Sequence, residues 1–176
     1  MLHVTYFKGT GGESILVDGF KLAQVIKEDN PDHYHILSTV PLDYCYKDKD
    51  NHYLNSHVPF TLNPGTGNVS QVHFNNYDRS PISARTLQAL HSVKPNGSIA
   101  DIYRAIQSFI ETMRERELQY RFHLKPGRGL IFDNHRVLHA RTAFTDKRRL
   151  CGGYVNREDW RSRVMVTRNK LCDLCI

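Results

Sequence analysis

Residues 129–141 read GLIFDNHRVLHAR and contain two short apolar runs separated by a polar turn. The runs, residues 129–132 and 137–138, have the length and composition of β-strands, and the second leads directly into His139. The stretch therefore predicts antiparallel β structure that ends on a histidine, with several arginines close behind it.

Alternating apolar and polar residues predict more short strands on either side of this stretch. They lie at residues 1–7, 14–19, 69–75, 120–124, 149–155 and 164–166. A glycine-rich turn joins the first two, so we expect those two to form a β-hairpin. Residues 44–67 are rich in Asn, Asp, Lys, Pro and Gly, which predicts a loop with one short strand near residues 58–62.

Two segments have the apolar period of an α-helix. The shorter spans residues 20–29 and is expected to stop at Pro31, and the longer spans residues 99–118 with Ser98 as its N-cap. The longer helix carries a stripe that we interpret as core packing: Ile102, Ala105, Ile106, Phe109, Ile110 and Met113. Many short strands with one long helix favour an antiparallel β-sandwich or barrel with helical insertions.

The composition is that of a globular protein of one domain, with 176 residues, 40% of them hydrophobic and 24% charged. No stretch has the length and apolarity of a membrane span, so we expect no membrane partner. The formal charge of +6 is scattered over the sequence, which favours a site for small acidic molecules over a nucleic-acid partner. Cys172 and Cys175 have the spacing of half a zinc site or a redox pair, but a single such pair favours two thiols on a tail.

Ten histidines raise the question of a metal site, because neutral imidazole is a common metal ligand. Most of them lie in polar stretches that are typical of solvated surface residues. His139 differs because it follows an apolar strand. One histidine cannot build a metal site alone, so spacing by itself favours a core histidine without a metal.

Three blocks of the sequence resemble, in order, the catalytic domain of the trimethyllysine and γ-butyrobetaine dioxygenase family. They are residues 9–20 (GTGGESILVDGF), residues 75–79 (NNYDR) and residues 124–154, which begin LKPG and include FDNHRVLHAR and RLCGGY. Together they span nearly the whole chain, and three ordered blocks are more specific than any single motif. The NYDR and LCG segments favour the trimethyllysine enzymes.

The resemblance implies a mainly β fold with helical insertions, a double-stranded β-helix (jelly roll) that is incomplete at its N-terminal side. Residues 1–166 would form the C-terminal part of the catalytic domain, and residues 167–176 a tail. Fe(II) would be held on one face by two histidines and one carboxylate, which leaves room for 2-oxoglutarate and oxygen. Ascorbate is an implied reductant, the partner would be a small trimethylammonium amino acid, and a homodimer is left open.

Residue by residue, the resemblance assigns His139 to the distal iron ligand. Arg148 resembles the arginine that pairs with the far carboxylate of 2-oxoglutarate, a task that suits a planar guanidinium. Ser14 resembles the hydroxyl residue that helps to seat this cosubstrate. Tyr154 resembles an aromatic residue that packs on the trimethylammonium group, and Asn75 a polar residue near the substrate.

The sequence also departs from the family. The family's other two iron ligands form an HxD motif upstream of the Ser14 position, which would fall before Met1, and the 176 residues contain no HxD. We therefore expect a truncated chain that is inactive as given and binds Fe(II) weakly. His135 stands where family members carry Trp, so a pocket contact is expected to differ. Arg141 and Arg149 are alternatives to the cosubstrate arginine.

The function that the resemblance implies is hydroxylation of N6,N6,N6-trimethyllysine in carnitine biosynthesis by an Fe(II)- and 2-oxoglutarate-dependent dioxygenase. The alternatives are hydroxylation of γ-butyrobetaine to carnitine, and a catalytically dead chain that lacks the HxD ligands. A trimethyllysine enzyme would be mitochondrial, and a γ-butyrobetaine enzyme cytoplasmic.

Overall fold

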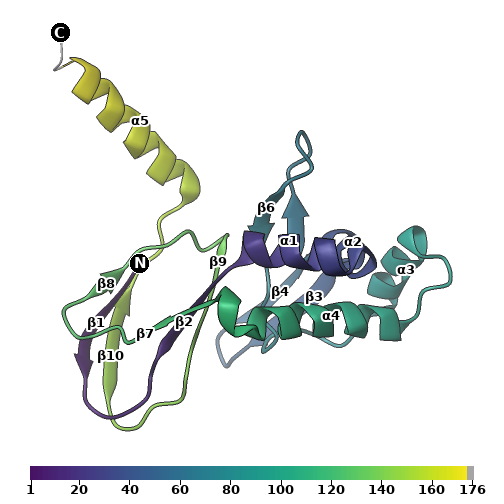
Figure 1. Ribbon diagram of the computed structural model, residues 1–176, viewed down its shortest axis with the longest axis horizontal. Coiled ribbons are helices and arrows are strands. Elements are labelled where there is room, and N and C mark those ends of the chain that lie inside the picture. The colour runs from purple at the N-terminus through teal and green to yellow at the C-terminus, as the bar shows by residue number, and fades with distance from the viewer. Residues whose placement is uncertain (174–176) are drawn as a thin grey trace. The chain divides into compact units, whose positions relative to one another are not determined.

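The computed structural model describes residues 1–173, in which ten β-strands, five α-helices and one 3-10 helix are found (Figure 1). These residues divide into two compact units. Unit 1 contains Met1–Thr10, Leu124–Phe132 and the described chain from Phe144 onward. Unit 2 contains Gly11–His123 and Asp133–Ala143. The predicted combination of a mainly β architecture with helical insertions is confirmed, since both units contain an antiparallel sheet and four helices lie between β2 and β7.

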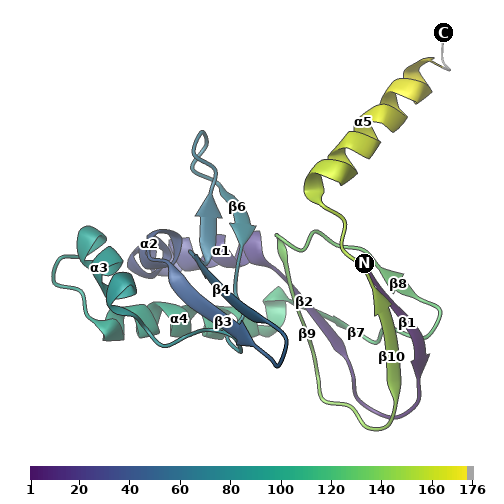
Figure 2. The ribbon, with the colours of Figure 1, turned by 180° about the vertical axis from the view of Figure 1, so that it is seen from behind.

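Unit 1 is built on a three-stranded antiparallel sheet in the order β10-β1-β8 (Figure 2). Its strands are β1 (Leu2–Phe7), β8 (Gly129–Leu130) and β10 (Arg148–Gly152). Val4 of β1 is completely buried and lies opposite Leu150 of β10. A register shift between Val4 and Tyr6 marks an irregularity of the kind that bends a strand.

Unit 1 ends in the helix α5 (Arg157–Asp173), so the strand predicted at residues 164–166 is wrong. The Val-Met-Val run is too short to impose a strand on a segment whose other residues are mostly charged or polar and compatible with a helix. The predicted boundary between residues 166 and 167 falls inside this helix. Of the CxxC pair, Cys175 lies outside the described residues.

Unit 2 contains the second three-stranded antiparallel sheet, in the order β7-β2-β9. Its strands are β2 (Ser14–Asp18), β7 (Gln119–Phe122) and β9 (Val137–Arg141). The predicted hairpin of the first two strands is therefore wrong, because β1 and β2 belong to different sheets. Gly9, Gly11 and Gly12 all have positive φ angles, so the turn has a backbone conformation that favours glycine. It leads the chain into a new sheet, whose other strands come from much later in the sequence.

Four helices are inserted between β2 and β7, and a 3-10 turn, η1 (Arg116–Leu118), precedes β7. They are α1 (Gly19–Asp29), α2 (Pro31–Thr39), α3 (Ala84–Val93) and α4 (Ile99–Arg114). The helix predicted at residues 20–29 is confirmed, and Pro31, expected as a stop, also starts α2 at its first turn. The predicted long helix is confirmed to Arg114, with the Ser98 N-cap in a capping box, while α3 was not predicted.

The core of unit 2 lies among α1, α2 and α4. The apolar stripe of α4 is buried as predicted, with Ile102, Ala105 and Phe109 at most 1% exposed. The Phe109 ring stacks on Phe74 at 4.2 Å between ring centroids and lies 5.5 Å from the ring of Phe60. This aromatic cluster joins the long helix to the strands of the insertion.

Two small antiparallel hairpins complete unit 2. They pair β3 (Leu42–Lys47) with β4 (His52–His57), and β5 (Phe60–Leu62) with β6 (Val69–Val72). The short strand predicted near residues 58–62 is confirmed by β5, while the loop predicted for the rest of residues 44–67 is wrong where β3 and β4 lie. Part of the polar composition of this segment belongs to the β3–β4 turn. The Asp48 carboxylate accepts hydrogen bonds there from the backbone nitrogens of Asp50 and Asn51.

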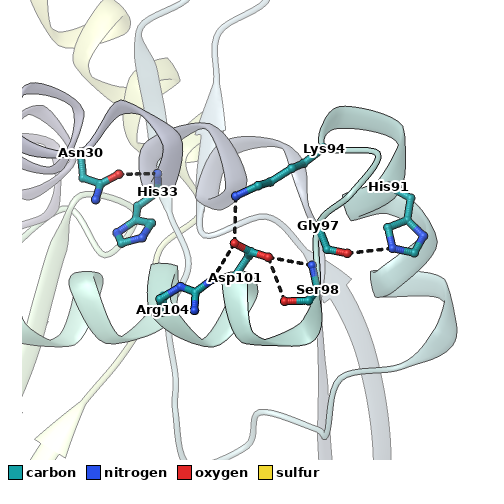
Figure 3. Close-up of polar contacts among 8 residues, drawn as sticks. All are labelled: Asn30, His33, His91, Lys94, Gly97, Ser98, Asp101 and Arg104. Carbon is teal, nitrogen blue, oxygen red and sulfur yellow. Dashed lines mark hydrogen bonds and ion pairs between the residues drawn. The ribbon is translucent and has the colours of Figure 1, made fainter.

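Asp101 connects α3 to α4 (Figure 3). Its carboxylate accepts hydrogen bonds from Lys94 Nζ and an Arg104 guanidinium nitrogen, both at 2.8 Å. It also accepts from the backbone nitrogen of Ser98 at 2.7 Å and from the Ser98 hydroxyl at 2.9 Å. These contacts, led by the Lys94 hydrogen bond, hold the pKa of Asp101 well below its usual range. None of the helices in the described residues is both long and apolar enough to cross a membrane.

Candidate functional site

The strand register of the β7-β2-β9 sheet shows which predicted site residues share a face. Residues directly opposite each other in an antiparallel pair have side chains on the same face. Leu16 lies opposite His139 and Ser14 lies opposite Arg141, so Ser14 and His139 share one face, two positions apart along the strands. We call this the His139 face. Ser14 is 9% exposed, whereas His139 is exposed and its Nδ1 lies 3.4 Å from the backbone oxygen of Val137.

The opposite face of the same sheet borders a cavity of about 870 Å³ within unit 2. Ile15 and Val17 contribute from β2, and their opposite residues Arg121 and Gln119 contribute from β7. We call this the cavity face. His139 also borders the cavity, and its strand β9 lies at an edge of the sheet. The volume is that of a site for a small molecule.

One wall of the cavity is a row of three histidine rings, His57, His73 and His135, which we call the histidine row. The ring centroids of His57 and His73 are 4.6 Å apart, and those of His73 and His135 are 6.1 Å apart. Tyr44 stacks on the outer side of His57 at 4.4 Å. Burial, with a smaller contribution from the two neighbouring histidines, lowers the pKa of His73 to about 4. His73 is therefore neutral at pH 7.

The β3–β4 hairpin supplies a second, aromatic wall. Tyr46 lies directly opposite Tyr53, and both border the cavity with their rings stacked at 6.3 Å. Asn75, predicted to lie near the substrate, also borders the cavity, in the segment that follows β6. Its side chain is partly engaged, because Nδ2 donates to Asp78 and Oδ1 accepts from the backbone nitrogen of Tyr77.

Two ion pairs lie at the β7-β2-β9 sheet. Arg121 donates to Glu13 at 3.1 Å and to Gln119 at 2.7 Å. At the end of β2, both Asp18 carboxylate oxygens accept hydrogen bonds from Arg136, at 2.6 and 3.0 Å. This hydrogen-bonded pair lowers the pKa of Asp18 and fixes the segment that leads into β9 and His139.

Arg148 and Tyr154 belong to unit 1. Arg148 lies in β10 opposite Phe7, and Tyr154 follows this strand with 86% of its surface exposed. Within unit 2 the structure brings Ser14 and His139 onto one face and puts Asn75 at the cavity. The assignments of all five residues stay predictions.

The described residues do not build an iron site by themselves. Fe(II) in the implied site needs two histidines and a carboxylate, and no group of three or more potential ligands among His, Cys, Asp and Glu occurs in the described part of the chain. His139 offers one imidazole and Ser14 one hydroxyl on the shared face.

Comparison with known proteins gives the family. The model of the family described as "Taurine catabolism dioxygenase TauD, TfdA family" matches residues 1–154. The chain belongs to this family. Within the TauD/TfdA family the chain is similar to trimethyllysine dioxygenase of Neurospora crassa, with 38% identity over 87% of the chain and 31% of the relative. It is 34% identical to the mitochondrial trimethyllysine dioxygenase of Gallus gallus, over 90% of the chain and 37% of the relative.

Two further proteins complete the comparison of this TauD/TfdA chain. Gamma-butyrobetaine dioxygenase of a Pseudomonas species is 31% identical over 94% of the chain and 41% of the relative. The crystal structure of AAD-2 in complex with Mn(II) and N-oxalylglycine has a TM-score of 0.58 and 13% identity, and covers 85% of this chain and 58% of AAD-2. The chain thus spans between about a third and two fifths of the length of these curated relatives.

Sequence reasoning missed the histidine row and the aromatic wall. His57, His73 and His135 come from three separate segments, and only the fold brings their rings together. A signal existed for the wall, because Tyr44 and Tyr46 lie two positions apart, between Asp43 and Lys47. Their period of two indicates a strand with one aromatic face, although the polar composition suggested a loop.

Proposed function

We propose that this chain carries part of the active site of an Fe(II)- and 2-oxoglutarate-dependent dioxygenase that hydroxylates N6,N6,N6-trimethyllysine in carnitine biosynthesis. The observation that carries the proposal is the 34–38% identity to trimethyllysine dioxygenases over most of the chain. The proposal includes ascorbate as reductant and, because the Gallus gallus relative is named mitochondrial, a mitochondrial location. We also propose the double-stranded β-helix as the fold of the domain to which this chain belongs.

Each assigned residue has a role in this proposal. Bound iron would supply oxygen activation, and the chain's own residues would bind and orient the two organic molecules. His139 would donate an imidazole nitrogen to the metal, and Ser14, on the same face, would hydrogen-bond 2-oxoglutarate. The guanidinium of Arg148 would pair with the far carboxylate, since a planar fork of N–H donors suits a carboxylate. Tyr154 and Asn75 would contact the substrate.

A second candidate is hydroxylation of γ-butyrobetaine, which the 31% identity to the Pseudomonas enzyme supports. Both substrates would be trimethylated amines with a carboxylate, and they differ in length and in the α-amino group. A catalytically dead chain is the third candidate, because the described residues hold fewer ligands than the metal needs.

The reaction itself discriminates among these candidates. Succinate released from 2-oxoglutarate is measured with Fe(II), ascorbate and either amine, for the chain alone and for the chain joined to an HxD-bearing segment of a relative. We expect no turnover by the chain alone, and trimethyllysine-dependent turnover by the joined protein. Arg148→Ala should mainly raise the 2-oxoglutarate concentration required, while the same effect in Arg141→Ala instead would move the cosubstrate contact to β9. Turnover only with γ-butyrobetaine would select the second candidate.

A further inference from the structure

The positive charge of this chain is concentrated in unit 1. Unit 1 contains 11 of the 24 Lys and Arg residues but only 4 of the 18 Asp and Glu residues, so its formal charge is +7. Unit 2 is more than twice as long and has a formal charge of −1. The fold thus gathers basic residues that are scattered along the sequence into one unit, and this unit attracts acidic partners.

The helix α5 of unit 1 exposes apolar side chains. Trp160 and Met165 are each 58% exposed, and Val166 is 44% exposed. Residues 157–168, the part of α5 whose side chains are described, contain no buried residue. Most helices in proteins gain their stability by packing an apolar face on another element, rather than from intrinsic helix propensity. A partner that covers α5 would therefore stabilise this helix.

One side of α5 combines an apolar pair with flanking arginines. Trp160 and Val164 are four residues apart and therefore lie on the same side of the helix. Because each residue of an α-helix is rotated by about 100° from the one before it, Arg163 lies on one flank of this pair. Arg161 and Arg168 lie on the other flank, and all three arginines are exposed. We call these five residues the Trp160 face.

An open hollow of about 420 Å³ lies beside Trp160. Besides Trp160 itself, the hollow is lined by Val155, Asp159, Ser162, Arg163 and Val166. The two valines and the indole ring give it apolar walls that can receive an apolar side chain of a partner. Trp and Arg are the residue types that most often contribute a large share of the binding energy at protein–protein interfaces. The hollow and the Trp160 face thus have the composition of such an interface.

The chemistry of the Trp160 face selects among partners. A second copy of α5 would bring arginines against arginines on both flanks, which disfavours pairing of two such helices. A helix that binds a membrane surface needs its apolar side chains on one side, whereas Met165 and Val166 point away from the side of Trp160. Nucleic acid would use the arginines through its phosphates but would leave the apolar pair uncovered. An acidic protein helix with an apolar seam satisfies both parts of the face.

We propose that the Trp160 face is a docking surface for an acidic amphipathic helix of a second protein. Apolar side chains of the partner would pack on Trp160 and Val164, and its carboxylates would pair with the arginines on the two flanks. In paired helices, charges beside an apolar seam decide which partner is accepted. This role goes beyond the proposed dioxygenase function and does not depend on it.

The test uses the fluorescence of Trp160, which is the only tryptophan in the sequence and therefore reports on this face alone. The probe is a synthetic helical peptide about three heptads long, with leucine along its seam and glutamate on both flanks. A matched peptide carries lysine in place of glutamate. We expect the glutamate peptide to shift the emission to shorter wavelength and to bind less tightly as salt is added. The lysine peptide should cause no shift.

Charge reversal tests the flanks. Arg161→Glu combined with Arg163→Glu should weaken binding of the glutamate peptide by at least about tenfold and should allow the lysine peptide to bind. Lys21→Glu combined with Arg116→Glu is the matched control, because it makes the same change of charge at exposed residues of unit 2. The control should bind the glutamate peptide within about twofold of the wild-type chain. Circular dichroism checks that each variant is folded.

Several results would overturn the proposal. The absence of a shift with the glutamate peptide, or an equal loss of binding in both charge-reversed variants, would remove the docking role of the Trp160 face. Tighter binding to vesicles of mixed phosphatidylcholine and phosphatidylserine, or to a duplex oligonucleotide, would assign the face to another class of partner. A dimer in sedimentation that Trp160→Ala dissociates would assign it to a second copy.

The joined protein provides the last test. A fluorescently labelled glutamate peptide should bind it as it binds the 176-residue chain, and loss of this binding would mean that the protein covers the Trp160 face itself. Succinate release judges the proposed function separately. An active dioxygenase that ignores the peptide would refute the docking role alone.

Discussion

The two faces of the β7-β2-β9 sheet differ in what they offer to a ligand. The His139 face holds Ser14 and His139, which family resemblance assigns to the cosubstrate and the iron. The cavity face borders an open cavity lined by aromatic rings, amides and charged groups. A single strand, β2, serves both, because alternate residues point to opposite sides. The comparison teaches that one backbone builds both the chemical residues and the ligand cavity, and that His139, which also borders the cavity, belongs to both.

The largest effect should come from the His139 face. In the joined protein that supplies an HxD motif, His139→Ala is expected to abolish turnover, because one of three protein ligands is lost. The measurement is succinate release with trimethyllysine. His35→Ala, at an exposed histidine of α2, should leave turnover unchanged. Full activity of His139→Ala would show that the distal ligand is misassigned.

A comparably large effect on the same face concerns the chain alone. With one predicted ligand and no group of three or more in the described residues, the 176-residue protein should bind Fe(II) weakly. Equilibrium dialysis with Fe(II) under anaerobic conditions measures this. Tight binding of one iron per chain, together with trimethyllysine-dependent succinate release, would mean that the missing ligands are supplied from within these residues.

A substitution in the hydrophobic core of unit 2 should destabilise the residues that line the cavity. Phe109→Ala should lower the free energy of unfolding by about 3–5 kcal/mol, because a fully buried aromatic ring leaves a cavity behind it. Phe74, which stacks on Phe109, borders the ligand cavity and should lose its position as well. Denaturant unfolding gives the free energy. Ile99→Ala in the same helix, at a residue that is 44% exposed, should cost much less.

The histidine row should make the cavity face sensitive to acid. The folded state keeps the pKa of His73 near 4, against 6.5 in the unfolded chain. Below about pH 6.5 the unfolded chain therefore takes up a proton that the folded chain does not. The free energy of unfolding should fall as the pH drops from 6.5 towards 4, with no loss from this group above that window.

His73→Phe separates the histidine row from other acid effects. It keeps an aromatic ring between His57 and His135 but cannot titrate, so the fall in stability over this pH window should become shallower. His35→Ala should leave the slope nearly as it is. Denaturant unfolding at a series of pH values measures the slope, and an unchanged slope in His73→Phe would rule out His73 as its source.

The smallest predicted effect lies at the start of α4. Ser98→Ala should lower the free energy of unfolding by about 1 kcal/mol, because the helix loses its capping side chain. The loss should leave ligand binding at the cavity unchanged. Ser92→Ala is the matched control, since the Ser92 hydroxyl donates only to the preceding turn of α3. Thermal unfolding of both variants provides the comparison.

Local sequence signals predicted elements whose cause is also local. The α4 helix follows from Ser98, Asp101 and an apolar stripe with helical spacing, and all of these lie within one segment. The segment leading to His139 follows from short apolar runs around a turn. The β3–β4 hairpin was missed because its turn residues outweighed the period-two pattern of its tyrosines, although that pattern was present.

Long-range partners were not predictable in this way. No short-range sequence pattern indicates that β2 pairs with β7 and β9, which begin at Gln119 and Val137. Nor does one indicate that the glycine turn after β1 leads into a different sheet. The expected hairpin failed for this reason. The same limit applies to the histidine row, whose three rings are more than sixty residues apart from first to last.

By itself the sequence determined the family, the helices with strong caps and stripes, and the candidate chemical residues, because each depends on residue identity and short-range order. Only the tertiary structure decided that Ser14 and His139 share a face, that Asn75 fixes a turn, and that Tyr77 stands exposed at a cavity. Strand register and packing settle these points. Strand register and packing depend on contacts between segments that are distant in the sequence, so no single segment determines them.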